Sequence, residues 1–386
     1  MSSQPDSSPG GWSTPRSAYL HVPFCRHRCG YCNFSVLAGR DDLADNFLDA
    51  IEHELSLLIT PRPIDTLFIG GGTPTHLTLS QLDRFFDSID RWLRRDAGAE
   101  STVEANPEDI EPKKLQLLAS RGVNRISLGV QSFRTTKLQQ LQRSHQGEAA
   151  QVAIQQCADW IGNVSIDLIF GVPGETIGNW QTDLATALAL PIKHLSTYAL
   201  TFEKGTQFWT ERLRGNMKEV CEDDDVSMYQ DAIRLASDAG LAQYEISSFA
   251  RNGFRCRHNL AYWEGKGWFA FGPGAASFVD GYRNVNHRST TTYLKRIHEG
   301  LSPIAQRESI SKTQYACERA AFGIRMIDGI DLNQIQIESG IDVKKLRQQE
   351  LQKCERDELI RVSGSHHRLT ERGILMADSV AAAFLG

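Results

Sequence analysis

The sequence predicts an α/β protein, with a parallel sheet or barrel followed by a C-terminal helical, winged-helix-like domain. The first observation is that short apolar runs alternate with longer amphipathic runs from about residue 17 to about residue 200. Strands separated by helices of this length are joined as parallel crossovers. The second observation is a change after about residue 300 to short helices followed by two short strand-like pieces.

Six runs in the first part have the composition of buried strands, and they begin at Ala18, Thr66, Thr102, Arg125, Val164 and Leu195. Amphipathic helices are predicted between them, from Asp45, Leu79 and Pro112 and over 152–157. Polar or glycine residues follow each strand-like run at once. Because sites form where the carboxyl ends of parallel strands converge, the six loops should face one cavity. A seventh candidate strand runs from Gln243 to Ser247.

The last part of the chain has the element order of a winged-helix module. Helices are predicted over 313–326, 332–338 and 343–354, strands over 359–362 and 367–369, and a final helix from Thr370. Such modules often bind DNA. Residues 301–386 contain 12 basic and 12 acidic side chains, so the positive footprint that DNA binding requires is missing. A packing or partner-docking role is favoured, and no nucleic-acid partner is expected.

Composition sets the remaining limits. The 386 residues carry 42 basic and 47 acidic side chains, and a formal charge of −5 argues against bulk nucleic-acid binding. No apolar run approaches a bilayer span, and the start lacks a secretory signal, so a cytoplasmic protein is expected. We expect a flexible leader over 1–16, a core over 17–245, an extension of the barrel over 246–300 and the C-terminal domain over 301–386.

Three of the eight cysteines, Cys25, Cys29 and Cys32, form a CxxxCxxC motif. A closed zinc site needs four ligands, and the chain has no second CxxC pair. Three thiolates can instead hold an iron–sulfur cube in which one iron lacks a protein ligand. Two alternatives stay open, a zinc site completed by His21 or His27 and a chance spacing of ordinary cysteines.

The motif, with Tyr31 directly before its last cysteine, resembles the radical S-adenosyl-L-methionine (SAM) superfamily. This resemblance implies a [4Fe-4S] cluster whose open iron is chelated by the methionine end of SAM, and one-electron cleavage of SAM to a 5′-deoxyadenosyl radical. The glycine run at Gly70 resembles the loop of the family that receives the methionine moiety. Backbone without Cβ atoms can approach a ligand closely and offer its N–H groups to a carboxylate.

A narrower resemblance is carried by YLHVPFC, GGGTPT, VEANP, GVQSF, IDLIFGVPGE and FGPGAAS. These segments resemble the branch that contains the coproporphyrinogen dehydrogenases and the haem chaperones, from about Ser17 to the C-terminus. The resemblance implies an incomplete parallel (β/α)6-type barrel. The cofactor-contacting positions that it implies are Tyr19, Tyr31, Gly71, Gly72, Thr73, Glu104, Gln131, Arg143, Asp167, Ala199 and Ala276. Gln131, Arg143 and Asp167 belong to a second SAM site, which relatives of the dehydrogenase need not fill.

Ordinary structural explanations exist for several of these residues. Glu104 could cap a helix, although a carboxylate at a strand end in a cleft suits a cofactor. Asp167 lies within an apolar strand, where an unpaired carboxylate would be costly, so it requires a partner. Arg143 could equally lie on a solvated helix face.

Two departures from the dehydrogenase pattern favour the chaperones. The dehydrogenase motif continues to a further cysteine where this chain has Phe34, and only 24 residues precede Cys25. The third feature is the signature His258-Asn259-x-x-Tyr262-Trp263, which resembles that of the chaperones. On a helix, His258 and Tyr262 would share a face, with Trp263 beside them as an edge for a flat macrocycle. Imidazole is also a common haem ligand, although a hydrogen-bonded core histidine is the ordinary alternative.

The resemblance therefore implies a haem chaperone that binds haem, a [4Fe-4S] cluster and SAM, and delivers haem to recipient haemoproteins, including membrane-associated respiratory enzymes. A homodimer is a further expectation. The leading alternative is an oxygen-independent coproporphyrinogen III oxidase that decarboxylates propionates. Whether the chain is an enzyme stays open, although a protein without that oxidase activity is favoured. A zinc-stabilised regulatory protein is the alternative from another class.

Overall fold

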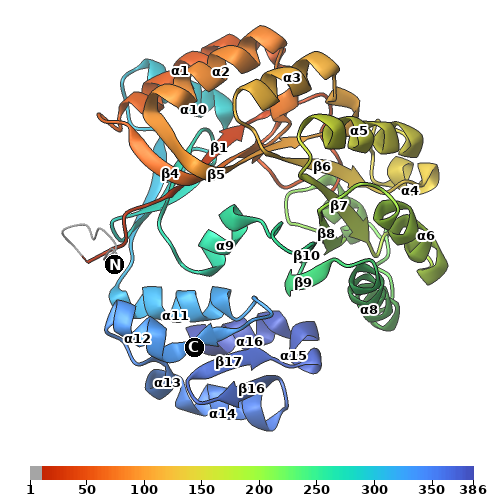
Figure 1. Cartoon of the computed structure of the whole chain (residues 1–386), viewed down its shortest axis with the longest axis vertical. Coiled ribbons are helices and arrows are strands. Elements are labelled where there is room, and N and C mark those ends of the chain that lie inside the picture. Colours follow the sequence, from red (N-terminus) through yellow and green to blue (C-terminus); the bar gives the residue numbers. More distant parts are fainter. Residues whose placement is uncertain (1–10) are drawn as a thin grey trace.

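The computed structural model describes residues 11–386 (Figure 1). Its main feature is a twelve-stranded sheet with the order β14-β13-β12-β11-β1-β4-β5-β6-β7-β8-β10-β9. The six central strands are parallel, as expected, and comprise β1 (Ser17–Val22), β4 (Arg62–Gly71), β5 (Leu93–Ala105), β6 (Arg125–Gln131), β7 (Val164–Phe170) and β8 (His194–Ala199). The predicted incomplete (β/α)6 barrel is confirmed.

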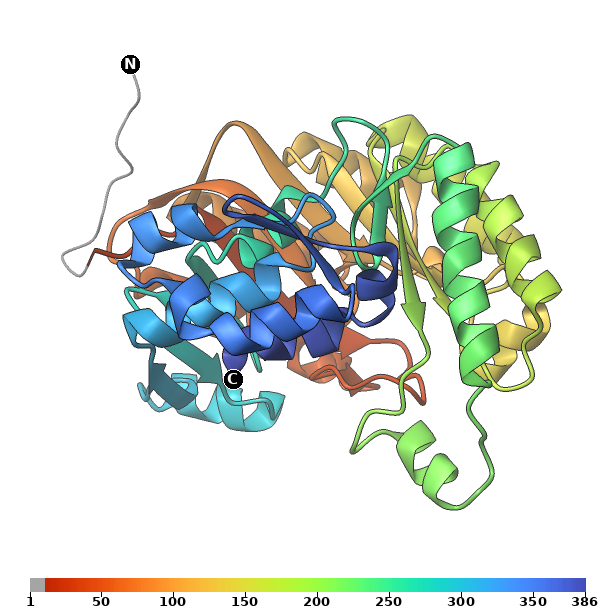
Figure 2. The same cartoon turned by 90° about the horizontal axis from the view of Figure 1, so that it is seen from below.

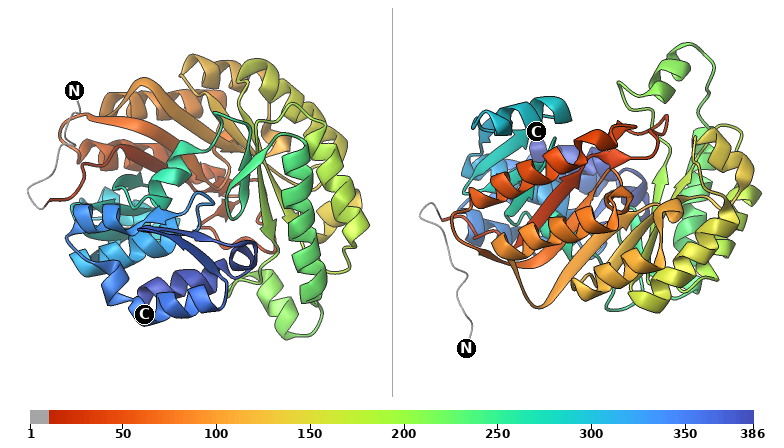
Figure 3. Two further views of the ribbon diagram at one scale, coloured as in Figure 1. Left: turned by 60° about the horizontal axis from the view of Figure 1, so that its bottom comes forward. Right: turned by 90° about the horizontal axis from the view of Figure 1, so that it is seen from above.

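Helices cover the outer face of these strands (Figure 3). They are α1 (Ala44–Ser56), α2 (Leu79–Trp92), α3 (Pro112–Ser120), α4 (Thr135–Gln140), α5 (Gly147–Trp160), α6 (Ile177–Leu188) and α8 (Glu222–Asp238). In α2, Thr78 and Gln81 form a capping box that starts the helix. One face of α2 is fully buried against the sheet through Leu82, Phe85, Phe86 and Ile89. The polar side chains of the barrel are thereby left to the inner face.

Antiparallel strands extend the sheet at both ends. On one side, β11 (Trp268–Phe271) runs parallel to β1 and is followed by the antiparallel strands β12 (Ala276–Val279), β13 (Tyr282–Asn286) and β14 (Ile304–Ser309). On the other, β8 pairs with β10 (Ser248–Ala250), which pairs with β9 (Ala242–Glu245). The predicted strand 243–247 corresponds to β9, which ends at Glu245. The Glu245 carboxylate accepts a hydrogen bond from Ser247 N (3.1 Å) in the turn that leads to β10.

Two short helices belong to this extension. Helix α9 (Arg257–Trp263) carries the His258 signature and precedes β11, and α10 (Thr290–His298) packs on α1. Figure 1 shows α9 between the strands of the barrel and the C-terminal domain. The segment with α7 (Gln207–Leu213) projects from the barrel in Figure 2. Its Phe208 N donates a hydrogen bond to Gly30 O (2.9 Å), which ties this segment to the cysteine loop.

The C-terminal domain has its own hydrophobic core. It contains α11 (Lys312–Gly323), β15 (Ile330–Asp331), α12 (Leu332–Ser339), α13 (Val343–Leu346), α14 (Gln348–Arg356), β16 (Ile360–Ser363), β17 (His366–Leu369), α15 (Glu371–Leu375) and α16 (Ala377–Leu385). The predicted helix 343–354 is broken at Arg347, and the final helix is broken at Met376, because both residues leave the helical conformation. The three short strands form an antiparallel sheet, as a winged-helix-like domain requires.

The expected flexible leader lies partly outside the described residues, since these begin at Gly11. The end of that segment is packed. Trp12 contacts Phe278 and Tyr315 edge-on, and Arg16 pairs with Asp65 (2.7 Å) and Asp96 (2.6 Å). The contacts of residues 12 and 16 therefore join this segment to the barrel and to the C-terminal domain. Among the described residues, no helix has the length and apolar character that crossing a bilayer requires.

Candidate functional site

The three cysteines of the CxxxCxxC motif lie in the loop between β1 and α1, where Cys25 ends the short strand β2 (Phe24–Cys25). Their thiols line a small cavity of about 140 Å³, which we call the cysteine pocket. The strand β2 pairs with β3 (Leu37–Ala38) and thereby closes the base of the loop. Further lining comes from the carboxyl ends of β4 and β5, from β6 and β7, and from Arg143, which lies between α4 and α5.

The glycine loop after β4 packs against this cysteine loop. Gly71 has a φ of 102°, and a Cβ atom there would lie 2.3 Å from the His21 ring. A Cβ atom on Gly72 would lie 2.6 Å from Phe24 O. Only glycine permits this approach. The amides of Gly72 and Thr73 donate to Val22 O (2.8 Å) and Phe24 O (2.7 Å). These two amides are thus used within the chain, and Gly71 N donates to the Glu104 carboxylate (2.9 Å).

A chain of hydrogen bonds runs from β5 to the cysteines. Asn106 Nδ2 donates to Thr73 Oγ1 (2.8 Å), which lies 3.2 Å from Cys25 Sγ. Arg143 Nη2 donates to Asn106 Oδ1 (2.6 Å), and its Nη1 lies 3.5 Å from Cys29 Sγ. Burial opposes the charge of Arg143, but Tyr31, Cys29 and other neighbours raise its pKa overall. A cation is thus fixed against the thiols.

These residues fit an iron–sulfur cluster better than a single metal ion. Among residues 11–386, no three Cys, His, Asp or Glu side chains converge on one point where an ion could be held. A cube distributes its thiolates over different irons, so it needs thiols around a cavity, as here. Burial raises the pKa of Cys25 to about 12, because the charged thiolate is unfavourable away from water. A bound metal would offset the unfavourable free energy of this buried thiolate. Both ring nitrogens of His21 have partners within the chain, Tyr19 Oη (3.0 Å) and Ser35 O (2.8 Å), so His21 is not placed as a fourth zinc ligand.

A second and larger cavity of about 600 Å³ adjoins the cysteine pocket inside the barrel. Four residues line both spaces, namely Phe34, Glu104, Ser127 and Asp167. Several aromatic rings line the larger space, which we call the aromatic cavity, and they belong to Tyr19, Phe68, Tyr198, Tyr262 and Trp268. This volume lies within the range of about 300–1,000 Å³ that is usual for organic ligands.

Two carboxyl groups lie where the cavities meet. Burial raises the pKa of Glu104 to about 7 and that of Asp167 to about 6. Glu104 accepts a hydrogen bond from Gly71 N (2.9 Å), and a hydrogen bond with Ser196 lowers the pKa of Asp167. Neither residue caps a helix, so the alternative reading of Glu104 does not apply. The pair offers acceptors to a ligand that spans the two cavities.

His258 lies at the wall of the aromatic cavity and is buried. Its Nδ1 lies 2.9 Å from Thr66 Oγ1, and its Nε2 lies 2.8 Å from Tyr262 Oη. The ring is stacked on Phe68 at 5.1 Å. Burial lowers the pKa of His258 to about 3, so the imidazole is neutral. Both ring nitrogens thus have partners within the chain.

The structure brings most expected site residues together. The cysteine pocket receives Tyr31, Gly71, Gly72, Thr73, Glu104, Gln131, Arg143 and Asp167. The aromatic cavity receives Tyr19, Ala276, His258, Asn259 and Tyr262. Ala199 lies elsewhere, in a groove beside the C-terminal domain. Trp263 also differs from the expectation, because its ring lies against Arg325 of that domain. Residues that sequence reasoning missed are Phe68, Arg125, Tyr198 and Trp268.

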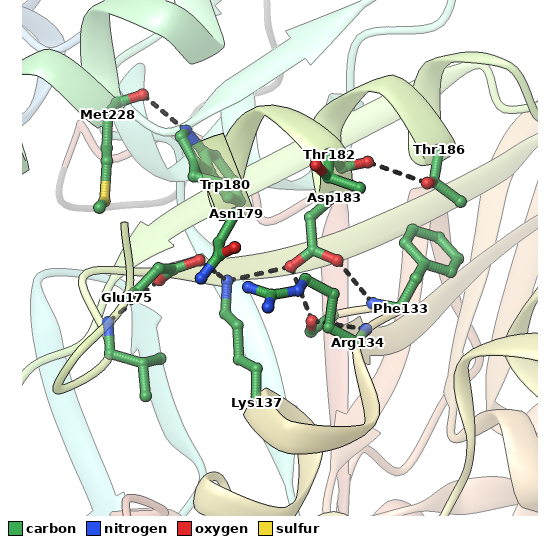
Figure 4. A network of polar contacts seen from close by, with 12 residues as sticks. Phe133, Arg134, Lys137, Glu175, Asn179, Trp180, Thr182, Asp183, Thr186 and Met228 are labelled. Atoms are coloured by element: carbon green, nitrogen blue, oxygen red, sulfur yellow. Dashed lines mark hydrogen bonds and ion pairs between the residues drawn. The ribbon is translucent and has the colours of Figure 1, made fainter. Parts of the chain in front are cut away.

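A buried ion network fixes the loops after β6 and β7 (Figure 4). The Lys137 ammonium lies between Glu175 and Asp183, 3.2 Å from the latter. The Asp183 carboxylate also accepts from Ser132 Oγ (2.6 Å) and Phe133 N (2.8 Å). These two residues follow Gln131, whose backbone is left-handed with a φ of 65°. Such a conformation persists where its surroundings hold it.

Comparison with known families matches residues 19–187 to the Radical SAM superfamily and residues 310–376 to the HemN C-terminal domain. The first range contains the three cysteines and the glycine loop. The second lies within the C-terminal domain and carries no residue of either cavity.

Two bacterial relatives match nearly the whole chain. "Heme chaperone HemW" of Bacillus subtilis is 34% identical over 96% of this chain and 99% of its own length. The protein of the same name from Mycobacterium tuberculosis is 33% identical over 96% of this chain and 95% of its own. Among solved structures, coproporphyrinogen III oxidase (HemN) of Escherichia coli matches with a TM-score of 0.85 and 22% identity over 96% of this chain and 90% of that one. The last comparison concerns the fold alone.

Proposed function

Because the chain belongs to the HemW family of radical SAM proteins, we propose that it binds haem and delivers it to recipient haemoproteins. One observation carries the proposal. A cavity of about 600 Å³ lined by several aromatic rings adjoins the pocket of the three cysteines, and the two share four lining residues. A flat macrocycle is recognised by aromatic faces, and a neighbouring cluster would be close enough to act on it.

The residues of each cavity suit different groups. Cys25, Cys29 and Cys32 would hold a [4Fe-4S] cluster, with Arg143 offsetting its negative charge. SAM would lie next to it, against Glu104 and the glycine loop. The cluster and SAM supply one-electron chemistry when bound. Haem would occupy the aromatic cavity, where Phe68, Tyr262 and Trp268 can contact its face.

We further propose His258 as a haem ligand, with Asn259 and Tyr262 beside it. A neutral imidazole is the form that binds iron, and burial keeps His258 neutral. Ligation through Nε2 requires Tyr262 to release its hydrogen bond. Trp263 has no place in this proposal, since it does not line the cavity.

The decisive experiment offers two tetrapyrroles to anaerobically reconstituted protein. The chain should take up about four irons for a single cluster and form a stable complex with haem. With SAM, reductant and coproporphyrinogen III, no protoporphyrinogen should appear. Conversion would establish the oxidase alternative instead, and zinc without acid-labile sulfide would exclude both radical SAM functions.

A matched pair of variants tests the cysteine assignment in the same preparation. Cys29→Ser should lose the cluster iron, whereas Cys221→Ser, which changes an exposed thiol away from the pocket, should keep it. Iron and sulfide analysis gives the answer. Recipient haemoproteins, membrane-associated respiratory enzymes among them, a homodimer and a cytoplasmic location belong to the same proposal.

A further inference from the structure

Arg125 has a place that neither the cluster nor SAM requires. It begins β6 with its side chain inside the barrel, only 2% exposed, and lines the aromatic cavity. Within the described part of the chain, its Nε and Nη1 have no hydrogen-bond partner. Buried polar groups nearly always have one, so such a group points to a missing partner. The cavity is the space from which that partner can come.

The neighbouring charges do not satisfy the guanidinium. Burial opposes its charge, but Cys256, Glu100 and Asp167 are among the neighbours that raise the pKa of Arg125, so it stays protonated. The Glu100 carboxylate accepts hydrogen bonds from the amides of Arg257 (2.9 Å) and His258 (3.0 Å). Asp167 is hydrogen-bonded with Ser196. These carboxyl groups have donors of their own and stabilise Arg125 only through space.

We propose that Arg125 binds a carboxylate of the ligand in the aromatic cavity and that this carboxylate is a tetrapyrrole propionate; the inference rests on the proposed function. A guanidinium presents two parallel N–H groups that match a carboxylate. Arg125 lies at the inner wall of a cavity that also presents the rings of Phe68, Tyr262 and Trp268, which suits a ligand with a flat apolar body and acidic side chains. A second guanidinium, that of Arg288, lines the same cavity, but it already donates to Asn33 O. The methionine carboxylate of SAM has the same chemistry, but Arg125 does not line the cysteine pocket.

Titration of the reconstituted protein with haem and with haem dimethyl ester tests the inference, because esterification removes both carboxylates. Wild type should bind haem roughly 10- to 100-fold more tightly than its dimethyl ester, which is the change in affinity expected for a hydrogen bond between charged groups. Arg125→Met should lose this preference for the free acid. Arg125→Lys keeps the positive charge but not the two parallel N–H groups, so it should keep part of the preference. Arg121→Met, which removes a guanidinium from the outer surface, should behave as wild type.

The outcomes separate the possible failures. Equal affinity of wild type for acid and ester, or a preference that persists in Arg125→Met, would overturn the role of Arg125 alone. A wild type that binds neither compound would overturn the proposed function as well. If Arg125→Met does not fold, the preference for the free acid over the ester is compared between wild type and Arg125→Lys, and an undiminished preference in Arg125→Lys would overturn the role of Arg125. SAM affinity should be the same in all variants; its loss in Arg125→Lys with an unchanged acid preference would assign the carboxylate to SAM and overturn the inference.

Discussion

At the scale of single residues, the site is built from polar atoms with defined partners. His258 contacts Thr66 through Nδ1 and Tyr262 through Nε2, so the imidazole is fixed in orientation before any ligand arrives. Each such contact restricts the tautomer of the ring. The haem-ligand proposal therefore depends as much on Tyr262 as on His258.

Tyr262→Phe tests this dependence. The substitution removes the hydroxyl that lies 2.8 Å from His258 Nε2 and keeps the ring in the wall of the cavity. If His258 ligates haem iron through Nε2, the variant should bind haem at least as tightly as wild type, because no hydrogen bond has to be broken first. Absorption titrations should show this, and His258→Ala should bind more weakly with a changed spectrum. Unchanged affinity and spectrum in His258→Ala would remove it as a ligand.

The sequence predicts the chemistry of most site residues but not the direction of each side chain. His258 and Tyr262 are four positions apart in α9 and share a face, as expected. Trp263, one position further, is rotated by roughly 100° and packs against Arg325 instead. Trp268 takes its place in the cavity because it comes from β11, and no local pattern reveals that this strand closes on β1.

At the scale of elements, buried charges join neighbouring segments. The ammonium of Lys137 connects α4 with the loop after β7 and with α6, and its contacts extend to the residues after Gln131 (Figure 4). Removing one partner of such a network leaves buried charges without compensation. The network therefore holds both loops of the site in register.

Lys137→Met should lower the free energy of unfolding by about 3–5 kcal/mol, since Glu175 and Asp183 would lose their common cation. Lys113→Met, on an exposed face of α3, serves as the control and should stay within about 0.5 kcal/mol of wild type. Denaturant unfolding of the apoprotein measures both. A loss below about 1 kcal/mol for Lys137→Met would contradict the role assigned to the network.

Glu54 of α1 plays a similar part on the other side of the sheet. Its carboxylate accepts from Gly272 N (2.8 Å), Asn286 Nδ2 (2.7 Å) and Tyr293 Oη (2.7 Å). Burial raises its pKa from 4.5 to about 7. Since the folded pKa lies above the unfolded one, the stabilisation is complete below pH 4.5 and is lost as the pH rises to about 7.

Glu54→Gln removes this titrating group. The amide NH₂ of the new side chain would face the donors that Glu54 accepts from, so the variant should be less stable at every pH. From pH 4.5 to 7 the stability of wild type relative to the variant should fall by about 3 kcal/mol. Denaturant unfolding across this range measures the difference. A constant difference between wild type and Glu54→Gln would contradict the prediction.

The elements themselves were largely predictable where periodicity decides them. All six parallel strands and the helices α1, α2, α3 and α5 follow from the alternation of apolar and amphipathic runs, whereas α4 and α6 were not predicted. The helix breaks near Arg347 and Met376 could not be predicted, because the residues around them are all compatible with a helix. The chain turns at these two positions to close the separate core of the C-terminal domain. The end of the strand predicted over 243–247 at Glu245, and the return strand β10 that follows, were likewise not predicted.

At the scale of the whole molecule, the C-terminal domain supports the barrel and supplies no residue to either cavity. It is joined to the barrel region by the ion pair of Arg255 and Asp328 (2.6 Å) and by the hydrogen bond from Ile327 N to Tyr244 O (3.0 Å). Residues 312–386 carry 11 basic and 11 acidic side chains, so the domain has no net formal charge. These contacts pack the domain against the barrel region, and its balanced charge offers no net attraction for phosphates.

The full chain should therefore show no binding to duplex DNA, even at low salt, where contacts with phosphates are strongest. A mobility-shift titration with a duplex of mixed sequence measures this. Binding that weakens as salt is added would contradict the prediction, and a loss of that binding in Lys344→Ala would place it on the C-terminal domain.

The pairing of β1 with β11 has a consequence for how the protein is made. Leu20 of β1 pairs with Phe271, a residue that leaves the ribosome about 250 positions later. At roughly 5–20 residues per second, this edge of β1 stays open for roughly 12–50 seconds of synthesis. An open, apolar strand edge readily pairs with other chains. A newly made chain is thus exposed to aggregation until β11 emerges, and slower translation of residues 23–271 would lengthen that interval.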